Sequence, residues 1–130
     1  MRIKIALIIF ISLFFMCSIS AQTYKPYVRI AKIEVDSAQL ESYKVALKVH
    51  AETAVRVEPG VITLYAVYDK DHPTYVTVFE IYANKEAYET HIQTAHFKKY
   101  KTSTQGMVKS LELTDVVPIA LEAKNKNSSN

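Results

Sequence analysis

The order of strand and helix patterns between residues 27 and 119 restricts this chain to few folds. Four segments rich in Val, Ile, Thr and Tyr predict strands, at 27–35, 61–68, 74–82 and 111–119. Helical spacing predicts one helix between the first two strands and a second helical region between the last two. Strand, helix, strand, strand, helix, strand is the split β-α-β order. The sequence therefore predicts a ferredoxin-like α+β domain over residues 22–119.

Local signals set the ends of the first helix. Asp36, with Gln39 three residues later, is typical of a capping box at a helix start. The proline and glycine of Glu58-Pro59-Gly60 end the helix. We expect one face of this helix to pack on the sheet, because apolar or aromatic residues and one histidine recur there at steps of three and four. These residues are Leu40, Tyr43, Leu47, His50, Ala54 and Val57.

The second helical region and the last strand carry signals of their own. Asn84 is a favoured N-cap residue for a helix that follows it. A break is expected near Thr94, with a further helical stretch from His96 to about Met107. Pro118 cannot donate a hydrogen bond to a strand ladder, so the last strand should lie at an edge of the sheet or end there.

The second and third strands have no polar side. Both faces of each strand carry mainly Val, Ile, Leu, Phe, Tyr or Thr, whereas an antiparallel sheet covered on one face normally has one polar face. Two helices can cover only one face. We therefore predict that a second copy of the chain covers the other, which gives a homodimer with the form of a dimeric α/β barrel.

The first 21 residues have the pattern of a secretory signal peptide. Arg2 and Lys4 precede an uncharged apolar run at 5–16, and small residues follow in Ser18-Ile-Ser-Ala21. A run of about a dozen residues is short for a membrane span, although a retained anchor is the alternative. We expect an exported protein, periplasmic or secreted, with no membrane attachment once the signal is cleaved.

Composition excludes several classes of function. Cys17 is the only cysteine, and the bulky Phe14-Phe15-Met16 before it disfavours lipidation; the mature chain then has no thiol for a disulfide or a metal. Cleavage of the signal removes Arg2 and Lys4, which lowers the number of basic residues from 16 to 14, against 13 acidic ones, so the mature chain is nearly neutral. A nucleic-acid partner is not expected, because the sequence lacks the basic stripe that such binding normally requires. The tail at 120–130 has few apolar residues to bury and is expected to be disordered.

Glu80 and two histidines have the most potential for chemistry. Glu80 lies mid-strand among apolar residues, where a carboxylate needs a raised pKa or a cationic partner; a purely structural carboxylate is the alternative. His50 and His91 could both point between the helices and the sheet and act as general bases. For His50, a hydrogen-bonded core histidine is the simpler interpretation.

The spacing of His91 and His96 does not predict a metal site. Five residues place them about 140° apart around a continuous helix, so they would bind one ion only if the helix breaks between them. On this basis we expect no metal.

Two blocks of sequence resemble the antibiotic biosynthesis monooxygenase family. The first is a strand that ends in Glu80-Ile-Tyr82, followed by His91-Ile-Gln-Thr-Ala-His-Phe97. The second is Arg56-Val-Glu-Pro-Gly60, followed by Leu64-Tyr65. The likeness extends over about residues 27–119, and the two blocks together are fairly specific for the fold.

The resemblance implies a pocket between the sheet and the helices of each subunit of a dimeric barrel. It also implies a monooxygenase without metal, flavin or other cofactor, in which a deprotonated small hydroquinone-like aromatic reduces molecular oxygen directly. Such chemistry needs a base and an apolar cavity that excludes water. The matching catalytic positions are His91 as base or substrate orienter, Glu80, and Tyr82 as an aromatic wall. The substrate-binding candidates are His50, Tyr65 as a hydroxyl donor, His96 and Phe97.

Departures from the family pattern leave other functions open. Tyr82 and Ala95 stand where the family often has Trp and Pro, and the chain has no Trp at all, which disfavours the haem degradation found in some relatives. The second block is also similar to that of an isomerase. The alternatives are therefore an isomerase of a small carbonyl compound and a non-catalytic dimeric barrel that binds a small apolar ligand.

Overall fold

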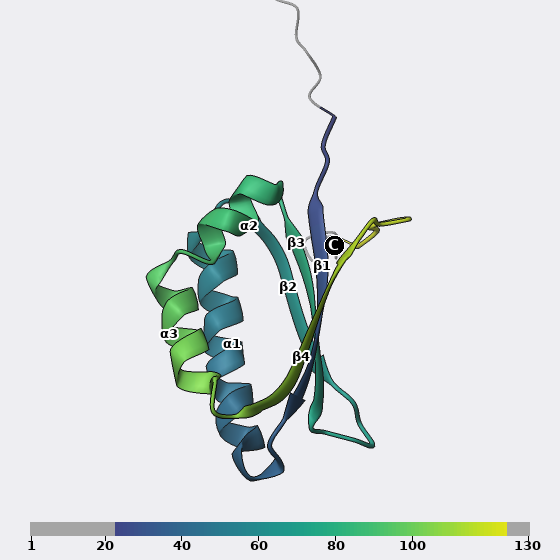
Figure 1. Cartoon of the computed structure of the whole chain (residues 1–130). Coiled ribbons are helices and arrows are strands. Elements are labelled where there is room, and N and C mark those ends of the chain that lie inside the picture. Colours follow the sequence, from purple (N-terminus) through teal and green to yellow (C-terminus); the bar gives the residue numbers. More distant parts are fainter. Residues whose placement is uncertain (1–22, 125–130) are drawn as a thin grey trace, which may run out of the picture.

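One antiparallel sheet with its helices on one face makes up the part of the chain that the computed structural model describes, residues 23–124 (Figure 1). The predicted signal peptide at 1–21 lies outside these residues, as do residues 125–130. The strand order is β2-β3-β1-β4, with every neighbouring pair antiparallel. This arrangement confirms the predicted ferredoxin-like α+β fold. The strands are β1 (Tyr27–Val35), β2 (Val61–Tyr68), β3 (Tyr75–Tyr82) and β4 (Val108–Val116).

Three α-helices and a short 3-10 turn connect the strands. They are η1 (Ser37–Gln39), α1 (Leu40–Val57), α2 (Lys85–His91) and α3 (Ala95–Thr104). Asp36 caps η1, since its carboxylate accepts a hydrogen bond from the Ala38 backbone N–H at 2.8 Å. Gln39 makes no side-chain capping bond to α1, so only the Asp36 half of the predicted capping box is present. None of the helices in residues 23–124 is long and apolar enough to cross a membrane.

The second helical region breaks where the sequence predicted. Asn84 caps α2 through a hydrogen bond from the Ala87 backbone N–H at 2.8 Å. Thr94 then caps α3 by accepting from the Phe97 N–H at 3.3 Å. This break separates the last residue of α2 from the first turn of α3 and lets their side chains converge.

The last strand begins three residues earlier than predicted, at Val108 instead of Leu111. Its first residue already pairs with Val35 of β1, and the Met107 carbonyl accepts a hydrogen bond from the Asp36 N–H at 2.8 Å. These non-local contacts order the strand from its start. β4 lies at an edge of the sheet as predicted, and Pro118 lies beyond its end.

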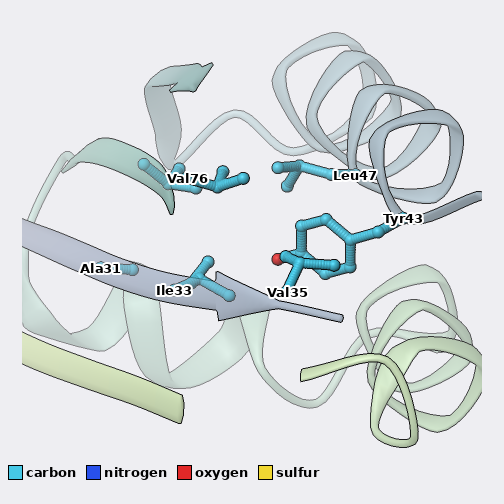
Figure 2. Packing of buried hydrophobic residues seen from close by; sticks show 7 residues of the cluster. Ala31, Ile33, Val35, Tyr43, Leu47 and Val76 are labelled. Carbon is cyan, nitrogen blue, oxygen red and sulfur yellow. The ribbon is translucent and has the colours of Figure 1, made fainter. Parts of the chain in front are cut away.

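The main core lies between α1 and the inner face of the sheet, the face that the helices cover (Figure 2). Its buried residues are Ala31, Ile33, Val35, Tyr43, Leu47, Val76 and Val78. In the predicted row on α1, the middle residues are buried, but Val57 is 53% exposed. That part of the prediction was wrong, because steps of three and four drift around a helix with 3.6 residues per turn.

The helices lie on one face of the sheet (Figure 1), and the other face, the outer one, carries exposed apolar side chains. Ile30 and Phe79 lie opposite each other on neighbouring strands and are half-buried. Tyr65, Val67 and Tyr75 on the same face are each more than half exposed. The absence of a polar side, which the sequence predicted for β2 and β3, is therefore a feature of these two strands in the folded chain.

Candidate active site between the helices and the sheet

A cavity of about 270 Å³ lies between the helices and the inner face of the sheet. Ala31, Ile33, Leu64 and Val78 line it from the sheet, and Leu47 lines it from α1. The volume falls slightly below the range of about 300–1,000 Å³ that is usual for small-molecule sites. The cavity is therefore suited to a small ligand with a single ring. A second hollow along α1 and β2 is more open and has no histidine in its wall.

Glu80 and Tyr82 form a buried hydrogen-bonded pair on the β3 wall of this cavity. The Tyr82 hydroxyl donates to Glu80 Oε2 at 2.7 Å. Burial raises the pKa of the Glu80 carboxyl, and burial together with the nearby Glu80 also raises the pKa of the Tyr82 hydroxyl. Glu80 therefore retains its proton to higher pH than an ordinary carboxyl group.

Arg29 lies directly opposite Glu80 in the sheet register but forms its ion pair with another residue. Its Nε donates to Asp115 at 2.8 Å, and its other guanidinium nitrogens donate to the hydroxyls of Tyr88 and Tyr27. The Arg29 bond is the largest of the effects that lower the pKa of Asp115. The cationic partner that the sequence allowed for Glu80 is thus engaged with an acid on β4.

A single carboxylate joins two of the histidines. Glu58 Oε2 accepts from His91 Nδ1 at 2.8 Å and from His96 Nε2 at 2.6 Å. Glu58 follows the end of α1, His91 ends α2 and His96 lies in the first turn of α3. Because a carboxylate only accepts hydrogen bonds, the proton of neutral His91 is on Nδ1 and its Nε2 is left as a proton acceptor. Burial lowers the pKa of the His91 ring, against the opposing effect of Glu58.

His50 lies beside these two histidines, at the α1 side of the cavity. Its ring centre is 5.2 Å from that of His91 and 5.8 Å from that of His96, and it stacks on the Tyr100 ring at 4.6 Å. Burial, reinforced by the two neighbouring histidines, lowers the pKa of His50 to about 4. Its Nδ1 is buried and has no hydrogen-bond partner among residues 23–124. The simple interpretation of a fully satisfied core histidine therefore does not hold.

Five of the seven predicted site residues line the cavity, and two do not. The five are His91, Glu80, Tyr82, His50 and Phe97. His96 is not part of the wall and contacts Glu58 instead. Tyr65 is 65% exposed on the outer face of the sheet, so its prediction as a hydroxyl donor to this cavity was wrong. Successive residues of a strand point to opposite faces, and the neighbouring Leu64 lines the cavity.

Two residues of the site, Glu58 and Arg29, were not predicted from the sequence. Glu58 was interpreted only as part of the helix end, although it belongs to the Arg56–Gly60 block that carried the family resemblance. Arg29 gave no signal beyond being a charge within an apolar strand. That single charge is a weak signal for a site residue, because strand residues on a solvated face are often charged.

Comparisons with known proteins agree with this architecture. The profile of the family described as antibiotic biosynthesis monooxygenase matches residues 26–103. A solved structure of a candidate antibiotic biosynthesis monooxygenase from Bacteroides thetaiotaomicron is 47% identical, with a TM-score of 0.75; the match covers 78% of this chain and 97% of that one. No protein with a curated function matches the sequence.

Two further solved structures show how far the similarity extends. A candidate monooxygenase from Lactobacillus acidophilus is 35% identical, with a TM-score of 0.71; the match covers 73% of this chain but 45% of that one. A candidate antibiotic biosynthesis monooxygenase from Nitrosomonas europaea is 21% identical, with a TM-score of 0.70 and coverage of 75% and 93%. The latter similarity concerns the fold alone.

Proposed function

This chain belongs to the antibiotic biosynthesis monooxygenase family, and from that premise we propose that it is a cofactor-independent monooxygenase of a small hydroquinone-like aromatic. The observation that carries the proposal is the pairing of His91 with Glu58 at the wall of a small, mainly apolar cavity. Glu58 holds the Nδ1–H of the ring, so Nε2 is available to accept a proton from a ligand.

The proposed reaction begins with removal of a proton from a substrate hydroxyl by His91. The Glu58 carboxylate stabilises the imidazolium that forms, because the two groups are hydrogen-bonded at 2.8 Å and largely buried. The electron-rich substrate anion then reduces molecular oxygen. One oxygen atom enters the ring and the other leaves as water, so a hydroquinone gives a hydroxyquinone without an external reductant. Apolar walls keep water away from the anion.

Glu80 has a different role in this scheme. Its raised pKa favours the neutral carboxylic acid, which can donate a hydrogen bond to a second oxygen atom of the substrate. Tyr82 supports it by donating to Oε2, and the Tyr82 ring forms part of the cavity wall. We propose that Glu80 orients the substrate while His91 performs the proton transfer.

Oxygen uptake tests this function directly. The purified protein is incubated with a panel of reduced, single-ring benzoquinones under isotope-labelled oxygen. Uptake above the autoxidation rate, with one labelled atom in the product, is the expected result. Ligand binding without uptake would favour the non-catalytic barrel, and conversion of a carbonyl substrate without oxygen would favour the isomerase.

We also propose that the outer face of the sheet binds a second copy of the chain, because it exposes Tyr65, Val67 and Tyr75. Val67→Glu should convert the dimer to a monomer in light scattering coupled to gel filtration, since a charge buried in an apolar interface is costly. Val49→Glu on α1 is the matched control, because the two valines are 59% and 60% exposed. A dimer that persists in Val67→Glu would place the interface elsewhere.

A further inference from the structure

Glu58, His91 and His96 bring three potential metal ligands to one point. One ligand atom from each residue lies within 4.8 Å of the others. The arrangement depends on the break between α2 and α3, since a continuous helix would separate the two imidazoles. The sequence allowed a shared ion only if the helix breaks between His91 and His96, and the fold contains that break.

We propose that Glu58, His91 and His96 form a binding site for one divalent transition-metal ion of the Zn²⁺ type. Two imidazole nitrogens and one carboxylate oxygen are a donor set that suits Zn²⁺, Co²⁺ or Ni²⁺, and three protein ligands leave a coordination position open. The hard ions Ca²⁺ and Mg²⁺ prefer sets made only of oxygen and are not expected to bind here.

The distances within this cluster are those of hydrogen bonds. The two contacts with Glu58 Oε2 measure 2.6 and 2.8 Å. A tetrahedral ion with bonds of about 2.0–2.1 Å would place its ligand atoms about 3.4 Å apart. His96 can move to make this room, because its side chain is 22% exposed, whereas that of His91 is 2% exposed. The ion would therefore enter from the side of His96 and displace the proton on each ring nitrogen.

His50 provides an independent observation at the same place. The residue is only 7% exposed, and its Nδ1 has no hydrogen-bond partner among residues 23–124. Buried polar atoms of this kind are rare in folded proteins and call for an explanation. This third imidazole, whose ring centre lies within 5.8 Å of both others, can serve as a fourth ligand or bind a metal-coordinated water.

Metal binding would oppose the proton transfer proposed for His91. An ion on Nδ1 leaves the remaining proton of the neutral ring on Nε2, so the ring can no longer accept a proton from a ligand. The site would then act as an inhibitory one. This consequence rests on the proposed function, whereas metal binding itself does not.

Titration with Co²⁺ tests the site by a readout that does not depend on activity. We expect one equivalent to bind the metal-free protein and give the visible absorption bands of four-coordinate Co²⁺, which Zn²⁺ then removes. His96→Ala should weaken binding by more than the roughly 10–100-fold that loss of an outer-shell partner costs, since it removes a direct ligand. His72→Ala is the matched control, because His72 lies in the exposed turn between β2 and β3.

Absence of Co²⁺ bands in the folded wild-type protein, or equal binding by His96→Ala and wild type, would overturn the proposal. Melting curves verify that His96→Ala is folded, and His96→Gln provides a second variant if it is not. If oxygen uptake is found, Zn²⁺ should inhibit it in wild type but not in His96→Ala. If none is found, the Co²⁺ titration still decides whether the metal site exists.

Discussion

Replacement of His91 by alanine is expected to lower kcat for oxygen uptake by about 10²–10⁴-fold, the usual contribution of a positioned general base. The proposed proton acceptor is Nε2 of His91, the ring nitrogen that Glu58 does not hold. His96 also bonds to Glu58, but it does not line the cavity. His50 also lines the cavity, but its pKa of about 4 makes it a weak base. Steady-state oxygen consumption with the best substrate of the panel measures the effect.

The His91 variant needs a control for folding, because the ring is buried and its loss leaves Glu58 with one partner fewer. His91→Asn retains a hydrogen-bond donor near Glu58 but has no group that titrates near neutrality. Both variants should lose kcat with KM changed much less. A variant that raises KM while kcat stays at the wild-type value would show that His91 only shapes the cavity.

Replacement of Gly60 by alanine is expected to destabilise the protein by about 1–3 kcal/mol, the usual cost of an added group in a packed interior. An alanine Cβ at this position would lie 2.6 Å from the Cβ of Ala87 in α2. The backbone is also tied there, since the Gly60 carbonyl accepts a hydrogen bond from the Ala83 N–H at 2.9 Å. Relief therefore requires a shift of β2 or α2. Urea unfolding monitored by circular dichroism measures the loss.

The other glycine of the chain supplies the control for this substitution. A Cβ added at Gly106 would meet nothing within 4 Å, so Gly106→Ala should change stability much less. Ala87→Gly in the Gly60→Ala background removes the overlapping methyl group, and should recover part of the loss even though glycine costs about 1 kcal/mol within a helix. Equal stability of Gly60→Ala and Gly106→Ala would contradict the proposed close contact.

The two predictions are connected through α2. Gly60 permits the close approach of α2 to the start of β2, and α2 ends at His91. Glu58, which holds His91, lies two residues before Gly60. A shift of α2 in Gly60→Ala should therefore lengthen the hydrogen bond between Glu58 and His91, and the variant should lose activity as well as stability.

Much of the fold follows from local properties of the sequence. The predicted bounds of β1 and β2 agree with the structure at both ends. The starts of α2 and α3 follow from Asn84 and Thr94, whose side chains cap the next few backbone N–H groups. Export stays a prediction, because residues 1–21 lie outside the described range. The apolar outer face was also visible in the sequence, since alternation within a strand is a local pattern.

The same pattern could not decide which of two apolar faces meets the helices. Both faces of β2 are apolar, so the alternation does not tell whether Leu64 or Tyr65 faces the cavity, and only the packing of α1 places Leu64 inside. Had one face been polar, the alternation would have identified the inner residues.

The centre of the site was decided by tertiary structure alone. Glu58 meets His91 and His96 across separations of 33 and 38 residues. Such contacts depend on the positions of three helices relative to one another, and no spacing within one element encodes them. The sequence determined the elements and the break between α2 and α3, because capping and periodicity act over a few residues. The packing of those elements on the sheet then determined that two histidines share one carboxylate.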